Sequence, residues 1–225
     1  MRAQLPGLLL VLTLFPSAHA LGPVLAQAPA QAQELAPIQL PAPSMTGGMP
    51  LMEALALRST SRAFRPDPLP IQTVSDLLWA AFGVNRPESG KRTAPSAVNW
   101  QETDLYVVVE EGTFLYQAME NRLDPVRAGD LRALTGVQEF VGDAPLTIVL
   151  VTDLNRIQRP SEEEKNFYSA IDAGFISQNI YLFCASEGLA TGVRALVDRA
   201  ALGEALGLGE HQKIVVAQSV GYPAG

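Results

Sequence analysis

The chain has few of the side chains that build disulfides, metal sites and catalytic triads. Its 225 residues include one cysteine and two histidines. Cys184 has no partner for a disulfide within the chain, and its apolar surroundings at residues 180–185 predict a packing residue rather than a nucleophile. His19 and His211 do not form a ligand pair with normal metal spacing, so no metal site and no His-based triad is expected.

Basic residues are also scarce. Lys and Arg total 16 against 23 Asp and Glu, which gives a net charge of −7. Nucleic-acid binding needs clustered Lys and Arg, so nucleic acid is not an expected partner, although a few local arginines could still hold an anionic cofactor. The chain has no Gly-x-Gly-x-x-Gly after a strand, no phosphate loop and no internal repeat. Its length suits one ordinary domain.

The N-terminus resembles a secretory signal peptide over residues 1–20. A positive start precedes an apolar core at residues 8–15, and Ala18-His19-Ala20 fits the cleavage pattern. The apolar run is short for a membrane span, so we expect an exported protein, in a bacterial periplasm, with no stable span after cleavage. An uncleaved anchor is the alternative. Residues 21–49 are rich in Ala, Pro and Gln and predict a linker, which leaves a folded domain at residues 50–225.

Periodicity and caps predict a mixture of helices and strands that do not strictly alternate. This order indicates an α+β fold rather than a parallel nucleotide-binding sheet. Helices are expected at residues 50–57 and 198–206. Another should start at Thr73 or Ser75 and end at Gly83, and a long one should run from Ser161 to about residue 187, opened by a Ser161–Glu164 capping box. The expected strands are 106–109 and 114–116 as a hairpin, then 121–126, a central 146–152, and 213–220, with a loop at 84–91.

Three segments could carry chemistry. Residues 92–101 are small, hydroxyl-bearing or amide residues between a helix and a strand, which suits a cradle for a flat polar ring but also an ordinary loop. Arg58 and Arg62 enclose three hydroxyl residues and could bind a phosphate, although a capped helix end with solvated arginines is the simpler explanation. Gly188 and Gly192 could let a ligand approach the backbone, which alone is weak evidence.

Taken together, these segments resemble the FMN-dependent nitroreductase superfamily over about residues 50–223. The resemblance rests on five motifs in order: Arg58-Ser-Thr-Ser-Arg62, residues 94–101, Ser177-Gln178-Asn179 in the long helix, residues 187–192, and Val220-Gly-Tyr-Pro223. Within the superfamily, Asn85-Arg86-Pro87, residues 92–97 and residues 111–116 look most like the branch that contains the azoline-oxidising dehydrogenases of thiazole/oxazole peptide biosynthesis.

The resemblance implies an α+β homodimer with a central, mostly antiparallel sheet flanked by helices, a long interface helix and two FMN sites between subunits. It places Arg58 on the FMN phosphate, with Ser59, Thr60 and Arg62 near the phosphate and the pyrimidine edge. It brings Pro95, Ser96, Ala97, Asn99 and Gln101 from the other subunit to the ribityl chain and ring, and directs backbone N–H groups of Gly192, Val193 and Arg194 towards flavin N5. No catalytic acid or base is implied.

The implied function is an FMN-dependent oxidoreductase of ping-pong type acting on a small organic or peptide-linked substrate. The alternatives are a non-catalytic exported flavin-binding protein and a degenerate member that serves as an interaction domain. NAD(P)H is a possible reductant, although a doubtful one after export. Many relatives have a longer C-terminal tail with basic phosphate ligands. Here the sequence ends at Gly225, so we expect Arg58 to act alone or with Lys91 or Arg92.

Overall fold

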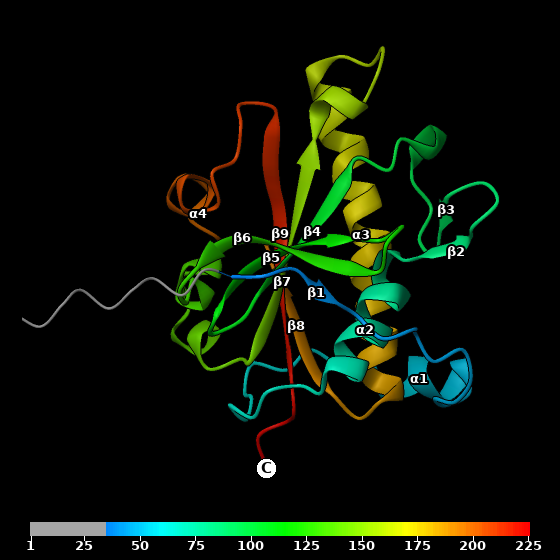
Figure 1. Ribbon diagram of the computed structural model, residues 1–225, viewed down its shortest axis with the longest axis vertical. Helices are drawn as coiled ribbons and strands as arrows, with labels where there is room; N and C mark the ends of the chain where they lie inside the picture. The colour runs from blue at the N-terminus through cyan, green and yellow to red at the C-terminus, as the bar shows by residue number, and fades with distance from the viewer. Residues whose placement is uncertain (1–34) are drawn as a thin grey trace, which may run out of the picture. The chain divides into compact units, whose positions relative to one another are not determined.

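A computed structural model of the protein describes residues 35–225, so the expected signal peptide and residues 21–34 of the expected linker lie outside the described part (Figure 1). The helices are α1 (Leu51–Leu57), α2 (Ile71–Phe82), α3 (Glu162–Ser186) and α4 (Arg199–Leu206), with short 3-10 turns η1 (Ala97–Asn99), η2 (Arg132–Thr135), η3 (Glu139–Gly142) and η4 (Leu154–Arg156). The strands are β1 (Ile38–Gln39), β2 (Val84–Arg86), β3 (Lys91–Arg92), β4 (Thr103–Val108), β5 (Gly112–Gln117), β6 (Arg122–Ala128), β7 (Leu146–Asp153), β8 (Ala190–Arg194) and β9 (Gln212–Gly221).

Seven of the strands form one antiparallel sheet in the order β1-β6-β5-β4-β7-β9-β8. β7 lies between β4 and β9, as its nearly all-apolar sequence predicted. Its side chains alternate between two cores: Ile148 and Leu150 face the core with α2 and α3, whereas Val149 and Val151 face the core with α4. Both faces of β7 are therefore buried, which confirms the α+β class and the helix-flanked antiparallel sheet.

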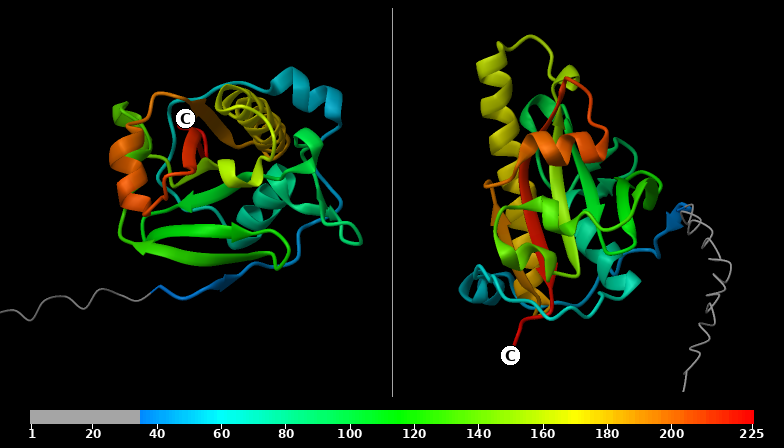
Figure 2. Two further views of the ribbon diagram at one scale, coloured as in Figure 1. Left: turned by 90° about the horizontal axis from the view of Figure 1, so that it is seen from above. Right: turned by 90° about the vertical axis from the view of Figure 1, so that its left-hand side faces the viewer.

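The long helix α3 follows from its own N-terminal sequence. Ser161 Oγ accepts the Glu164 backbone N–H at 3.3 Å, and Glu164 Oε2 accepts the Ser161 N–H at 2.9 Å, which is the expected capping box. The buried face of the helix, which includes Ile176, Ile180 and Cys184, packs in the core that α2 shares. Figure 2 shows α3 along its axis in the left view. The thiol of Cys184 is buried and unreactive, since burial raises its pKa.

Two expected boundaries were wrong. The folded unit begins before Pro50: β1 pairs with β6, and Leu40 is buried in the core. Apolar side chains that pack in or against the core, such as Leu40 and Ile38, outweigh the linker-like composition around them. Likewise, α2 begins at Ile71 after Pro70, whose fixed φ of −55° suits a helix start. Ser75 lies inside α2 and donates to the Pro41 carbonyl at 2.6 Å instead of capping the helix.

Two segments for which no strand was expected are strands. Residues 84–91 fold with residue 92 into the β2–β3 hairpin, which lies to the side of α3 in Figure 1. The glycine-containing segment after α3 forms β8, which pairs with β9 and is the last strand of the sheet. Across the described residues, no helix has both the length and the apolar character needed to cross a bilayer.

Candidate functional site

The first candidate site is built around Tyr181, a buried residue of α3. Its hydroxyl lies 2.9 Å from Thr60 Oγ1 and accepts the Val193 backbone N–H at 3.1 Å. A third contact joins the same segments, because the Ser61 N–H donates to the Thr191 carbonyl at 2.8 Å. The structure thus brings residues 58–62, which follow α1, against the outer edge of β8.

Gly192 is required by this close approach. A Cβ atom at this position would lie 2.5 Å from the Ser61 carbonyl oxygen, a distance that real side chains do not tolerate. In β8, the Thr191 carbonyl and the Val193 N–H point away from β9. Backbone groups alternate along a strand, so the N–H groups of Gly192 and Arg194 point towards β9 instead. Of these three residues, Val193 alone presents its N–H at the open edge.

The two arginines of this site carry uncompensated charge. Within residues 35–225, neither Arg58 nor Arg62 makes an ion pair or a side-chain hydrogen bond, and the Arg58 guanidinium lies 5.2 Å from the centre of the Tyr181 ring. Nearby Arg65, in contrast, pairs with Asp67 at 3.3 Å. Two unpaired guanidinium groups that flank exposed hydroxyls offer the donors that a phosphate group requires.

The side chain of Arg194 has a different environment. Its guanidinium is buried and donates to the Thr135 carbonyl at 3.0 Å, to Thr135 Oγ1 at 2.7 Å and to Ser219 Oγ at 2.8 Å. Burial lowers the pKa of Arg194 to about 10. The side chain therefore joins β8 and β9 to the segment at η2 and does not face the edge where Thr60 and Tyr181 meet.

The second candidate site is the loop from Pro95 to Gln101, which contains η1. Val98, Asn99 and Gln101 have φ angles of 51°, 61° and 50°, in the left-handed region that non-glycine residues avoid. Val98 is β-branched and 84% exposed, so packing of its own side chain does not compensate for this conformation. Such strain persists only where surrounding contacts impose it, and it often marks functional segments.

Hydrogen bonds within the loop, to Gly90 and to α3 impose this conformation. The Gln101 N–H donates to Ser96 Oγ at 2.9 Å, and the Gln101 side-chain amide donates to Asn99 Oδ1 at 3.2 Å and to the Gly90 carbonyl at 3.0 Å. The Ala97 N–H donates to Asp172 Oδ2 on α3 at 2.8 Å. The Gln101 side chain therefore braces the loop, while Pro95, Val98 and Asn99 are exposed.

The two candidate sites are separate within one chain. The loop contacts α3 at Asp172 and the arginine segment contacts it at Tyr181, nine residues further along, which corresponds to about 13 Å of helix. In Figure 1, η1 lies beside the upper half of α3 and α1 beside the lower half. Arg92 belongs to the loop site, since its Nε donates to Gln101 Oε1 at 2.9 Å, and it does not supplement Arg58 in the same chain.

The family model described as the nitroreductase family matches residues 55–222, which include both candidate sites. The chain belongs to this family. A provisionally named nitroreductase of Methanocaldococcus jannaschii is 29% identical over 151 residues, covering 63% of this chain and 76% of the relative. Family membership makes the protein an oxidoreductase by class.

Solved structures agree with this assignment. The crystal structure of a provisionally named nitroreductase from Ralstonia eutropha JMP134 is 42% identical, covers 85% of this chain and 91% of its own, and superposes with a TM-score of 0.81. A chain of the Escherichia coli microcin synthetase McbBCD complex, solved with truncated pro-MccB17 bound, is 18% identical, covers 87% of this chain and 80% of its own, and has a TM-score of 0.65. At that identity, the similarity concerns the fold alone.

The sequence did not reveal the residues that organise this nitroreductase fold around its sites. The sequence pattern does not single out Tyr181, although a buried tyrosine hydroxyl normally needs a partner and could have signalled a polar contact. Asp172, a carboxylate within the same helix, was not identified at all. Asp172 lies close in sequence to the core residues Ala173 and Ile176, and this position could have indicated a buried carboxylate.

Proposed function

We propose that this protein is an FMN-dependent oxidoreductase of ping-pong type, in which a reductant and an acceptor use one flavin site in turn. The observation that carries the proposal concerns Arg58 and Arg62, which form no ion pair within residues 35–225. In a nitroreductase-family fold, they lie beside the hydrogen bonds that join Thr60, Tyr181 and Val193. When bound, FMN supplies the redox chemistry, and the protein supplies binding and orientation.

The residues present fit an FMN molecule. Arg58 would hold the phosphate, with Ser59, Thr60 and Arg62 around it. The Tyr181 hydroxyl, which accepts the Val193 N–H, would provide a polar group at the edge of the ring system. The loop residues Pro95, Ser96, Ala97 and Asn99 would come from a second subunit, because their own chain holds them about 13 Å away along α3. Gln101 would support the site indirectly by bracing the loop, and Arg194 by fixing β8.

The surface of α3 supports the second subunit. Phe167, Ile171 and Phe175 are 62%, 38% and 45% exposed and follow one another at intervals of four residues. Gly174 lies on the same exposed face, with open space around it. An apolar stripe at this spacing is typical of a helix that packs against another helix. We propose that two copies of α3 form a homodimer across this face, which places each loop next to the partner's arginine segment.

For the substrate, we propose a small organic or peptide-linked molecule, in line with the azoline-oxidising branch. The structure of the McbBCD complex with a bound peptide precursor concerns a related fold and motivates a peptide-linked substrate here. We also propose export to a periplasm, based on the signal-like residues 1–20. In that compartment NAD(P)H is a doubtful electron donor.

Flavin binding tests the proposal. Purified protein is titrated with FMN and with riboflavin, which lacks the phosphate, and the quenching of flavin fluorescence is followed. We expect Arg58→Ala to weaken FMN binding by about 10- to 100-fold, as expected for loss of a charge-assisted contact, and to change riboflavin binding much less. Arg65→Ala is the matched control, because Arg65 is a nearby arginine that already pairs with Asp67.

The flavin titrations distinguish the proposed function from its alternatives. If the wild-type protein binds neither flavin, the proposal is wrong. If it binds FMN but transfers no electrons from NADH, NADPH or dithionite to an acceptor, the non-catalytic flavin-binding alternative replaces it. If Arg58→Ala affects FMN and riboflavin equally, Arg58 does not contact the phosphate.

A further inference from the structure

A buried carboxyl group lies directly behind the strained loop. Glu102 follows Gln101, precedes β4 and is completely buried. Neither of its carboxyl oxygens has a hydrogen-bond partner among the described residues. An ionised carboxylate without partners is costly to bury, whereas a carboxylic acid costs much less. The burial alone therefore favours a protonated Glu102.

The acidic side chain with a resolved effect on Glu102 belongs to the residue that anchors the loop. Asp172 on α3 is 2% exposed and accepts the Ala97 N–H through Oδ2 at 2.8 Å. The charge of Asp172 acts on Glu102, and each residue holds one part of the loop. Glu102 fixes the end of the loop through its own backbone, since its carbonyl accepts the Asp153 N–H at 2.9 Å.

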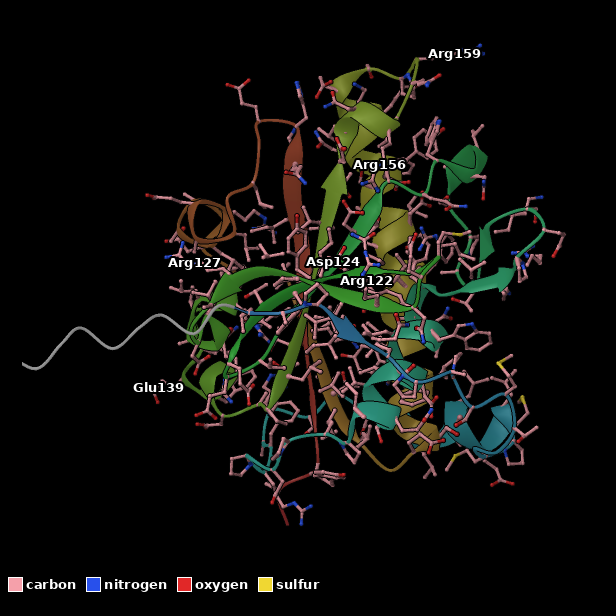
Figure 3. All side chains as sticks on the ribbon, in the orientation of Figure 1. Arg122, Asp124, Arg127, Glu139, Arg156 and Arg159 are labelled. Carbon is pink, nitrogen blue, oxygen red and sulfur yellow. The ribbon has the colours of Figure 1, made fainter. Side chains whose placement is uncertain are left out.

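One cation faces this pair. Arg156 on η4, labelled in Figure 3, binds both oxygens of Asp104 at 2.8 Å and donates to the Gln101 carbonyl at 3.2 Å. It also lies 3.6 Å from Asp153. Because two carboxylates already share Arg156, it offsets little of a second negative charge beside Asp172. The buried hydroxyls of Thr103 and Thr152 add no charge.

We propose that Glu102 and Asp172 form a buried acidic positioning pair that holds residues 96–101 in the conformation required at the cofactor site while Glu102 is protonated, and releases them when Glu102 loses its proton. The effect of this pair on FMN binding rests on the function proposed above, whereas the loop movement does not. Neither residue touches a reacting atom, so both act through the loop.

Electrostatics places the switch near neutral pH. Burial, together with the neighbouring Asp172, raises the pKa of Glu102 to about 7, against the opposite effects of a backbone hydrogen bond and of Arg156. Below this pH Glu102 is neutral, and Asp172 Oδ2 accepts the Ala97 N–H. Above it, a buried negative charge without a hydrogen-bond partner lies behind a loop with three left-handed residues that needs outside support.

The experiment follows the loop without flavin. The full chain carrying Trp79→Phe retains Trp100 as its single tryptophan, a loop residue that packs edge-on against Tyr168 at 5.6 Å. Trp100 emission and the hydrogen exchange of the Ala97 amide are measured from about pH 5.5 to about pH 8.5, a range that brackets the titration of Glu102. We expect a single transition near pH 7, with faster Ala97 exchange above it than the intrinsic pH dependence produces.

Variants in the same background assign the transition. Glu102→Gln keeps the shape of the Glu102 side chain but cannot ionise. Asp172→Asn keeps an oxygen acceptor for the Ala97 N–H but removes the charge of the carboxylate. Both variants should abolish the transition and keep the loop closed. Glu163→Gln, an exposed carboxylate of α3, is the matched control and should retain it. A transition that survives Glu102→Gln, or wild-type emission that stays constant across the range, would overturn the proposal.

An FMN titration separates the two proposals. If both hold, FMN affinity falls by about tenfold or more across the transition, in step with Trp100 emission, and Glu102→Gln removes this pH dependence. A Trp100 transition in a protein that binds no FMN at any pH would refute the proposed function and leave the positioning pair intact. Constant FMN affinity with a clear Trp100 transition would show that the loop does not contact the cofactor.

Discussion

Gly192 determines how closely the arginine segment approaches β8. The Ser61 carbonyl lies 2.5 Å from the place of a Cβ atom at this residue. We expect Gly192→Ala to lower the free energy of unfolding by about 1–3 kcal/mol, because backbone atoms must move apart. Urea denaturation followed by circular dichroism measures the change. Gly203→Ala in α4, where a Cβ atom meets open space, should instead stabilise the protein by up to about 1 kcal/mol.

The hydroxyl of Tyr181 has a similarly local role. Removing it in Tyr181→Phe leaves the Val193 N–H and the Thr60 hydroxyl without their partner. We expect a loss of about 1–3 kcal/mol in the free energy of unfolding. Tyr222→Phe is the control, because the ring of Tyr222 stacks with Arg65 and its hydroxyl has no hydrogen bond within residues 35–225. Equal effects of the two substitutions would contradict the role assigned to the Tyr181 hydroxyl.

At the scale of elements, α3 joins the two candidate sites and carries the proposed dimer face. We expect Phe175→Glu to convert a dimer into a monomer, since it places a charge within the exposed apolar stripe. Sedimentation velocity gives the oligomeric state. Val137→Glu adds the same charge at another exposed apolar residue, 59% exposed and far from α3 in sequence, and should leave the dimer unchanged. A wild-type monomer would contradict the role proposed for Ser96 and Asn99.

Elements with strong local signals were predicted correctly. The capping box at Ser161 and the apolar run of β7 each contain enough information within a few residues. The start of α2 and the strand β1 were not, because each depends on distant partners: Ser75 binds the Pro41 carbonyl, and β1 exists through its pairing with β6. Interactions between segments far apart in sequence decided these boundaries.

The candidate site was predictable to a similar extent. Residues 58–62 and Gly192 meet, as the family resemblance implied, but part of the link between the segment and β8 is the hydroxyl of Tyr181, which no local pattern marks. The inward direction of the Arg194 side chain depends on Thr135 and Ser219, which come from two other segments. Periodicity indicates that a residue is buried but does not identify its polar partners.

For the whole molecule, Glu102 makes stability depend on pH. Its pKa is about 7 in the folded chain against an ordinary value of 4.5, so the folded state holds more protons than the unfolded state between these values. Stability must therefore fall as pH rises through this range, and the contribution, up to about 3 kcal/mol, is fully present below about pH 4.5 and lost above about pH 7.

Urea denaturation at several pH values between about 5 and about 8 checks this expectation. Glu102→Gln should remove most of the decline, because glutamine does not titrate. A decline of the same size in this variant would assign it to other groups. Glu163→Gln should leave the decline unchanged, since Glu163 is exposed in both the folded and unfolded chains.

The contact between residues 58–62 and β8 also affects how the protein behaves at high concentration. β8 ends the sheet, and its outward N–H and C=O groups at Val193 and Thr191 are taken by Tyr181 and Ser61. An open strand edge can pair with the same edge of another molecule and start aggregation. The segment that offers its arginines to a ligand therefore also blocks growth of the sheet from chain to chain, so changes that loosen it should reduce solubility.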